Sequence, residues 1–370
     1  MMQDSDQSKL YHKGKKLVFF LGLILDFIFL AAFFVTGFSL FLRQWAQGFS
    51  SYPLVFRAVY MAVFCLIFYA IHGPLNYFVG FRWEHRFKLS NQKFGAWFAD
   101  EIKKSLLSFI IMLVFVEILY VILGTFPRHW WILASGVWLF ISLFLAQIMP
   151  HVIIPIFYKY SQIDDADLKE RIFSLFKKCR VTLKDVYAIN FSAKTKKANA
   201  FVCGLGSQRR VVLGDTLIED FTKEEIGAVV AHELGHYVAK DILKLIVVNT
   251  ALIFLGFFLI DKVLAIVLAR SGGLTINDIA VFPVFALALM VFGFLVTPLL
   301  NAFSCYLETQ ADRFSLTLTE DPQSFIGMMS KLGQKNLAEM NPSRFDEIMF
   351  YDHPPIAKRI KLAKNYMQKK

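Results

Sequence analysis

Long apolar runs, separated by short polar segments, dominate the pattern of residues along this chain. A helix needs roughly 20 mostly apolar residues to cross a bilayer. Runs of about that length or longer occupy approximately residues 17–42, 54–78, 106–126, 130–153, 245–268 and 279–303. The pattern therefore predicts a mainly α fold, a polytopic helical bundle with about six membrane spans.

The pattern changes between the fourth and fifth runs, where polar and apolar residues alternate over shorter distances. Residues 166–179 carry the apolar stripe of an amphipathic helix. Short strands are expected where β-branched and aromatic residues lie between turn residues, at residues 186–191, 198–204 and 210–217. This part of the chain thus has the pattern of a small α+β structure.

A further helix is expected at residues 224–241 and to continue into the fifth span. Thr222 is a plausible N-cap for it, and Glu225 stands at the capping-box position. We therefore expect two domains. Residues 1–157 form a four-span membrane module, and residues 158–370 combine the α+β portion with two further spans and a helical C-terminal tail.

The distribution of charge predicts which side of the membrane each segment faces. Six spans place both termini on one side, together with residues 82–104 and 158–244. The loop at residues 82–104 is rich in basic residues, namely Arg82, Arg86, Lys88, Lys93, Lys103 and Lys104. The loops on the other side offer only Arg43, Arg128 and Arg270. Short loops rich in Lys and Arg stay in the cytoplasm, so the α+β portion is expected there.

The composition of the chain limits the kinds of partner that it is expected to bind. Of the 370 residues, 56% are hydrophobic, and the net charge is +11. Because membrane topology accounts for the positive charge, we expect a lipid bilayer and no nucleic acid as a partner. The four cysteines form no CxxC pair and indicate no disulfide framework. The first apolar run is too long for a signal peptide and is interpreted as the first span.

The sequence His232-Glu233-Leu234-Gly235-His236 lies in the helix expected at residues 224–241. Two histidines four residues apart project from one helical face, so both imidazoles can bind a single Zn²⁺ ion. Glu233 is then placed to take a proton from a water that the zinc activates and to pass it to the leaving amine. The motif predicts hydrolysis of peptide bonds, although a helix with two solvated histidines and no metal remains its alternative.

A catalytic zinc site needs a third protein ligand and an open position for water. The sixth span would carry Glu308 to the membrane edge at which the fifth span begins. Asp312 follows one turn later and is placed to accept a hydrogen bond from a ligand imidazole, which would fix its tautomer. The candidate metal ligands are therefore His232, His236 and Glu308, with Asp312 behind them.

Two other segments carry candidate site residues. Asn199 stands in a predicted strand close to the metal helix, where a free strand edge would bind an extended peptide. His353 and Arg359 surround a Pro-Pro pair near the C-terminus, and both are candidates to stabilise a tetrahedral oxyanion. The alternatives are an ordinary turn asparagine for Asn199 and a helix start for the Pro-Pro segment.

Taken together, these motifs resemble those of the integral-membrane zinc metallopeptidases of the CAAX prenyl protease type 1 family, which are zincins. The resemblance covers most of the chain. Besides the motif at residues 232–236, it rests on Trp97-Phe98-Ala99-Asp100-Glu101-Ile102-Lys103-Lys104, Lys197-Ala198-Asn199-Ala200-Phe201, Glu308-Thr309-Gln310-Ala311-Asp312 and Tyr351-Asp352-His353-Pro354-Pro355.

The resemblance implies zinc binding by the two motif histidines and the downstream glutamate, catalysis by Glu233, and a catalytic cleft lined by Asn199 and His353. It also implies a zincin-like portion beside a water-filled intramembrane chamber. Such a chamber would account for polar residues within the spans, where helix–helix hydrogen bonding is the alternative. These residues are Asp26, His72, Glu117, Gln147 and His151.

The chain departs from the eukaryotic members of that family. They have an additional first span, a tryptophan where this chain has Tyr237, and a charged insertion where it has a short connection at residues 218–225. The shorter form indicates a prokaryotic member. The expected location is the bacterial inner or plasma membrane, or the endoplasmic reticulum membrane if the chain is eukaryotic.

The sequence thus predicts a membrane-embedded zinc endopeptidase that acts on peptide or protein substrates. The substrate is either a peptide lipidated at its C-terminus, as the family implies, or a membrane protein under quality control. A non-catalytic zinc scaffold is disfavoured because structural zinc sites have four protein ligands. Transport is disfavoured because no inverted repeat is visible. The oligomeric state is not encoded in any pattern that we recognise.

Overall fold

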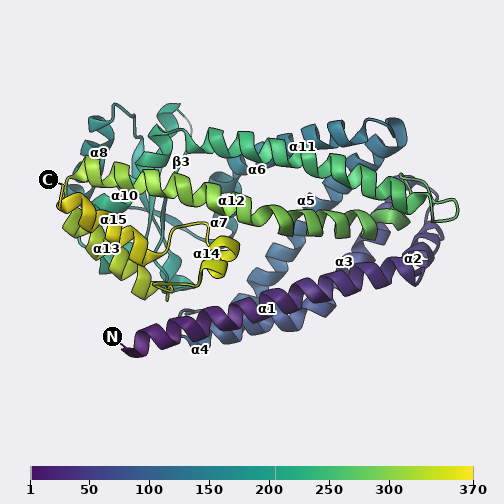
Figure 1. Cartoon of the computed structure of the whole chain (residues 1–370), viewed down its shortest axis with the longest axis horizontal. Coiled ribbons are helices and arrows are strands. Elements are labelled where there is room, and N and C mark those ends of the chain that lie inside the picture. Colours follow the sequence, from purple (N-terminus) through teal and green to yellow (C-terminus); the bar gives the residue numbers. More distant parts are fainter. Residues whose placement is uncertain (1, 205, 370) are drawn as a thin grey trace.

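The computed structural model describes residues 2–204 and 206–369, which form an elongated helical bundle with an α+β part at one end (Figure 1). Within these residues, six helices are long and apolar enough to cross a membrane, which confirms the predicted number of spans. They extend over Asp6–Val35, Pro53–Arg86, Phe94–Thr125, Trp130–Phe157, Asp241–Leu268 and Ile279–Thr319. Both ends of the chain lie at the α+β end of the bundle, as an even number of spans requires.

Twelve of the described elements build the bundle. In chain order they are α1 (Met2–Val35), α2 (Phe38–Gln47), α3 (Pro53–Tyr77), η1 (Phe78–Trp83), α4 (Glu84–Arg86), α5 (Phe94–Thr125), α6 (Trp130–Ile148), η2 (Met149–Ile153), α7 (Ile154–Phe157), α11 (Asp241–Leu268), η5 (Ile279–Val281) and α12 (Phe282–Thr319). Aromatic side chains fill the core between them, and Trp130 is fully buried there. The predicted run at residues 17–42 is not one helix, because Gly37 adopts a left-handed φ of 76° and separates α1 from α2.

Polar residues inside the spans pair from helix to helix. Asp26 of α1 lies 2.8 Å from the His72 imidazole of α3, and Glu117 of α5 lies 2.5 Å from the Arg57 guanidinium of α3. Asp26 also lines a cavity of about 290 Å³ between α1, α3, α5 and α12. The pairing agrees with the interpretation as helix–helix contacts, and the larger intramembrane chamber stays a prediction.

The α+β part contains a four-stranded sheet and the helices that pack around it. Its elements are β1 (Tyr160–Gln162), α8 (Ala166–Lys178), β2 (Asp185–Ile189), η3 (Phe191–Ala193), β3 (Ala200–Cys203), η4 (Gly206–Gln208), β4 (Arg210–Gly214), α9 (Asp215–Asp220), α10 (Lys223–Val238), α13 (Pro322–Lys335), α14 (Arg344–Phe350) and α15 (Ile356–Met367). The strand order is β1-β2-β4-β3, with β2 and β4 parallel and the outer pairs antiparallel. The sheet therefore ends at β3, and β1 is a strand that the sequence pattern did not predict.

The start of α10 has the predicted capping box. The Thr222 hydroxyl accepts a hydrogen bond from the backbone N–H of Glu225, and the Glu225 carboxylate accepts one from the N–H of Thr222. The predicted continuation of this helix into the fifth span is wrong. Lys240 adopts a left-handed φ of 56° between the end of α10 at Val238 and the start of α11 at Asp241. The chain turns there, which brings Asp241 back towards the last turn of α10.

Helix α10, which contains His232 and His236, is in close contact with α12, which contains Glu308. A Cβ atom at Gly235 would lie 3.2 Å from the Cα atom of Ala311 and 3.1 Å from the Phe314 ring, so a larger residue would fit only if these neighbours moved by a few tenths of an ångström. The Ser315 hydroxyl donates a hydrogen bond of 2.8 Å to the Ala228 carbonyl beside this contact. The 38 residues of α12 make it roughly 57 Å long, which lets it cross the membrane and still reach α10.

Replacing Gly235 with alanine should therefore destabilise the protein. The new methyl group meets the backbone of Ala311, which cannot give way as a flexible side chain would, and overpacking of this kind costs about 1–3 kcal/mol. Gly227→Ala on the same helix is the matched control. Among the described residues no heavy atom lies within 4 Å of its added Cβ, so it should stabilise by about 0.5–1 kcal/mol. Unfolding in detergent measures both, and equal effects would contradict the packing argument.

Candidate metal centre

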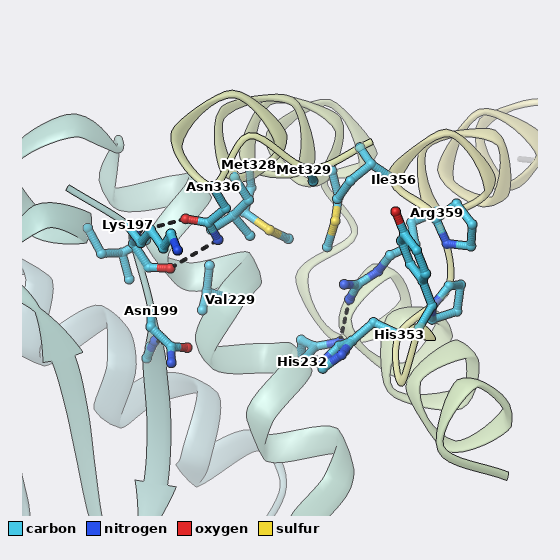
Figure 2. A pocket seen from close by; sticks show the side chains of 18 of the residues that line it. Lys197, Asn199, Val229, His232, Met328, Met329, Asn336, His353, Ile356 and Arg359 are labelled. Atoms are coloured by element: carbon cyan, nitrogen blue, oxygen red, sulfur yellow. Dashed lines mark hydrogen bonds between the residues drawn. The ribbon is translucent and has the colours of Figure 1, made fainter. Parts of the chain in front are cut away.

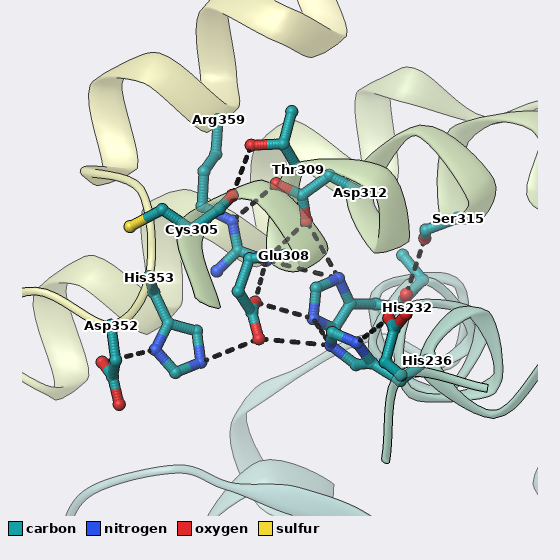
Figure 3. A network of polar contacts seen from close by, with 12 residues as sticks. His232, His236, Cys305, Glu308, Thr309, Asp312, Ser315, Asp352, His353 and Arg359 are labelled. Atoms are coloured by element: carbon teal, nitrogen blue, oxygen red, sulfur yellow. Dashed lines mark hydrogen bonds and ion pairs between the residues drawn. The ribbon is translucent and has the colours of Figure 1, made fainter. Parts of the chain in front are cut away.

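His232 and His236 of α10 and Glu308 of α12 converge on one point (Figure 3). One ligand atom from each residue lies within 4.8 Å of the other two, a geometry in which all three can bind one ion. The two Nε2 atoms are 3.2 Å apart. The Glu308 carboxylate oxygens lie 3.1 Å from Nε2 of His232 and 3.2 Å from Nε2 of His236. The structure thus brings together the three predicted metal ligands.

Two further carboxylates orient the imidazoles. Asp312 lies 2.9 Å from Nδ1 of His232, and Asp241 lies 2.9 Å from Nδ1 of His236. With each Nδ1–H donated to a carboxylate, both Nε2 lone pairs point towards the same space. Asp312 was predicted for this position. Asp241 was not, because the turn at Lys240 that places it has no glycine or proline to signal it.

The donor atoms fit a divalent metal. When the Nδ1–H groups of His232 and His236 donate hydrogen bonds to carboxylates, the Nε2 atom of each neutral ring is an acceptor. Two acceptors cannot hydrogen-bond to each other, yet these Nε2 atoms lie 3.2 Å apart. Oε2 of Glu308 is buried and faces Nε2 of His232 at 3.1 Å. A cation between these atoms satisfies all three at once, and two imidazoles with one carboxylate are a common set for catalytic zinc. The arrangement leaves further coordination positions to water or substrate.

Burial and neighbouring charges determine the protonation of the groups on α10. Burial alone would lower the pKa of His232, but hydrogen bonds to Asp312 and Glu308 outweigh it and raise this pKa to about 9. The pKa of His236 is raised in the same way, by Glu308 and Asp241 against the effect of burial. Burial raises the pKa of Glu233, and the two neighbouring histidines offset only part of that rise. A carboxyl group of raised pKa is suited both to accept and to return a proton.

His353 reaches the site from the loop before α15. Its Nε2 atom lies 3.3 Å from Oε1 of Glu308, and its Nδ1 atom lies 2.7 Å from the Asp352 carboxylate. About half of its side chain is exposed, so one face of the ring remains open to a substrate. Burial alone would lower the pKa of His353, but Asp352 and Glu308 outweigh this effect and raise the pKa above its usual value, which favours the protonated imidazolium.

Arg359 binds Asp312 next to His232, and its side chain also borders the cleft that Glu233 lines. Its Nε and Nη2 atoms donate hydrogen bonds of 2.8 and 2.5 Å to the two oxygens of Asp312. The guanidinium is buried, and its Nη2 atom is also 3.4 Å from Nδ1 of His232. These contacts favour a role in holding Asp312 against His232. The predicted contact of Arg359 with an oxyanion stays a prediction.

A cavity of about 420 Å³ opens beside Glu233 (Figure 2). His232, His353 and Arg359 line one side, Lys197 and Asn199 line the approach to β3, and Met328, Met329 and Ile356 form an apolar wall. Asn199 is exposed, and its side-chain oxygen accepts a hydrogen bond of 2.9 Å from the N–H of Ala200. The structure therefore places all of the predicted site residues around one cleft or directly behind it.

Asn336 is a cleft residue that the sequence did not reveal. Its carboxamide accepts a hydrogen bond of 3.1 Å from the N–H of Ala198 and donates one of 3.4 Å to the carbonyl of the same residue. The two residues are 138 positions apart, and no local motif marks Asn336 as the partner of a strand.

Asp241→Asn should weaken metal binding by about 10–100-fold, because the amide no longer fixes the His236 tautomer as the carboxylate does. Lys244→Met is the matched control, since Lys244 contacts the other oxygen of Asp241 at 2.8 Å and leaves the contact with His236 in place. Competition with a metal chelator measures the affinity of both variants. Equal losses would show that Asp241 acts through general charge and not through His236.

Comparisons with known proteins agree with this geometry. The family model "Peptidase family M48" matches residues 162–367, which is more than half of the chain. The model "CAAX prenyl protease N-terminal, five membrane helices" matches residues 2–159. Four of the six candidate spans of the described chain lie in that second range.

Similar proteins come from bacteria and eukaryotes. The uncharacterized metalloprotease YhfN of Bacillus subtilis is 29% identical over 360 residues, covering 95% of this chain and 84% of that protein. CAAX prenyl protease 1 of Saccharomyces cerevisiae is 29% identical over 319 residues, covering 80% and 69%. The crystal structure of S. mikatae Ste24p superposes with a TM-score of 0.85 at 22% identity, covering 98% of this chain and 89% of that one, which shows a shared fold. The chain therefore belongs to peptidase family M48 and is a multi-pass membrane metalloendopeptidase.

Proposed function

We propose that Zn²⁺ is the metal of this site and that His232, His236 and Glu308 are its ligands. The observation that carries the proposal is the convergence of these three donors within 4.8 Å, with both imidazoles already oriented by carboxylates. Asp312 and Asp241 act by holding the imidazoles in place. Arg359 acts by holding Asp312, and through it His232.

Glu233 is the proposed general base and acid. When bound, the zinc ion polarises the substrate carbonyl and makes a nearby water more acidic. The Glu233 carboxylate takes the proton of the attacking water and then delivers it to the leaving amine. The protonated His353 is placed on the open side of Glu308 to donate a hydrogen bond to the developing oxyanion.

The edge strand β3 is the proposed binding site of the peptide chain. An extended peptide adds to a free sheet edge through backbone hydrogen bonds. Asn199 lies directly before β3 and lines the cleft. Its whole carboxamide becomes available to a substrate when the side-chain oxygen gives up its hydrogen bond from the N–H of Ala200. Substrate and metal then meet at the same place.

We further propose that the metal site faces the cytoplasm, at the inner or plasma membrane of a bacterium. The basic loop at residues 82–104 and both termini lie at the site end of the bundle, which fits the enrichment of Lys and Arg in cytoplasmic loops. Residues 1–157 act as a membrane module, and residues 158–370 carry the peptidase chemistry.

For the substrate, we propose a CAAX-like peptide or protein that ends near the membrane, with or without a lipid at its C-terminus. The support is the match of residues 2–159 to the N-terminal CAAX protease model and the likeness to proteins named CAAX prenyl protease 1. Quality-control cleavage of unfolded membrane proteins is the competing assignment.

Glu233→Gln should abolish most of the cleavage and leave zinc in place. Loss of a general base lowers kcat by about 10²–10⁴-fold, whereas the three ligands are untouched. His232→Ala is the comparison variant and should lose zinc as well as activity. Metal content and single-turnover cleavage of the purified protein measure both, and full activity of Glu233→Gln, or resistance of the wild type to chelators, would remove the proposed mechanism.

A substrate comparison separates the two assignments. Wild-type protein is given a farnesylated CAAX peptide, the same peptide without the lipid, and an unfolded membrane protein. We expect a kcat/KM about tenfold higher for the farnesylated peptide, since an apolar chain adds to the binding free energy. Equal rates for the two peptides would remove lipidation from the proposal, and a preference for the unfolded protein would support quality control.

A further inference from the structure

The chain just before the edge strand β3 is held by the membrane module. Residues 194–196 pair in antiparallel fashion with residues 89–91, which join α4 to α5, through a bridge between Ser90 and Thr195. The N–H of Lys196 donates to the Leu89 carbonyl at 2.9 Å, and the N–H of Asn91 donates to the Lys194 carbonyl at 3.0 Å. The strand that is proposed to bind substrate thus begins on a segment anchored outside the peptidase domain.

Lys197, the next residue of this segment, belongs to a cluster of charged and polar side chains from α1 and α4. Nζ of Lys197 lies 3.0 Å from Glu84 of α4 and 3.0 Å from the hydroxyl of Tyr11 in α1. The Tyr11 hydroxyl donates a hydrogen bond of 2.6 Å to Glu84, and Lys15 of α1 lies 2.9 Å from the same carboxylate. Lys197 also lines the cleft, two residues before Asn199 (Figure 2).

The N-terminal part of α1 also contacts the chain on the opposite side of the cleft entrance. Ser8 and His12 of α1 each contact the carbonyl of Leu337 at 2.9 Å. The preceding residue, Asn336, is the one that binds both backbone polar groups of Ala198. The site end of α1 therefore contacts the chain on both sides of the point where the substrate strand enters the cleft.

Burial distinguishes this cluster from an ordinary surface ion pair. Tyr11 is 2% exposed and packs against Trp83 and Leu89, and the Glu84 side chain is 14% exposed. An exposed pair contributes little because water competes for both charges. Removing Glu84 instead leaves the partly buried ammonium groups of Lys197 and Lys15 without their carboxylate, and removing Lys197 breaks the ion pair that joins Glu84 to the segment before β3.

We infer that Glu84, Tyr11 and Lys197 are positioning residues for substrate binding, through which the first membrane helix fixes the start of β3 relative to the metal centre. The inference rests on the proposed binding of substrate to the β3 edge. None of the three residues touches the metal ligands. The cluster should therefore affect how well a peptide binds and not how fast the bound peptide is cleaved.

The test uses the full-length protein in detergent with Glu84→Gln, Lys197→Met and the charge exchange Glu84→Lys/Lys197→Glu. Each single variant should raise KM about tenfold, with kcat within about twofold of the wild type. Backbone amides of residues 197–202 should exchange hydrogen about tenfold faster, because their segment opens more often. The double exchange should recover only part of both effects, because Lys15, which lies 2.9 Å from the Glu84 carboxylate, then faces a second ammonium group. Tyr11→Phe keeps the ring and loses only the hydroxyl, so its effect should be smaller and its folding unaffected.

Glu101→Gln is the matched control, because Glu101 contacts Lys104 on its own helix at 2.7 Å and, among the described residues, makes no contact with the segment before β3. It should leave KM and the exchange rates unchanged. A fall in kcat at constant KM, or exchange rates equal to those of the wild type, would overturn the inference. If the wild type cleaves no peptide, the proposed function fails, whereas the hydrogen-exchange comparison still decides the positioning.

Discussion

The packing of α10 against α12 is the contact on which the rest of the site depends. Neither helix carries a complete set of the proposed metal ligands, since the histidines come from one and Glu308 from the other. Gly235 allows the two backbones to approach, and the same approach brings Asp312 to Nδ1 of His232. One helix–helix contact thus determines both the ligand set and the tautomer of one ligand.

A chain of alternating charges extends from that contact into the α+β part. Arg359 of α15 binds Asp312, which binds His232, and Glu308 stands between both imidazoles and His353. Buried charges persist only when each is paired, and an isolated one would shift its protonation or disrupt the packing. The C-terminal helix is therefore part of the metal centre, although it supplies no ligand.

Much of this arrangement could be predicted from sequence because its determinants are local. Apolar runs define spans, and a spacing of four residues puts His232 and His236 on one helical face. Glu308 was predicted from its membrane depth, because the sixth span ends at the edge where the fifth span begins, and from the resemblance to the CAAX prenyl protease family. The capping box at Thr222 and Glu225 is equally local, and the structure contains it.

The remaining features depend on contacts that no local pattern records. The turn at Lys240 occurs in a sequence without glycine or proline, so Asp241 could not be assigned to His236. Asn336 meets Ala198, and Tyr11 meets Lys197, only because separate helices pack at the cleft entrance. The position of Arg359 behind Asp312 likewise follows from how α15 packs against α12.

The helices that supply Glu308 and Asp241 are also membrane spans, and this has a mechanical consequence. A bilayer thinner or thicker than the apolar length of a span tilts or bends that span at modest cost. Tilting α12 or α11 moves the carboxylate that it carries, Glu308 or Asp241, relative to the imidazoles of α10, which is not itself a span. The acyl chains of the surrounding lipids set the hydrophobic thickness of the bilayer, and this thickness therefore influences the distances between the carboxylates and the imidazoles.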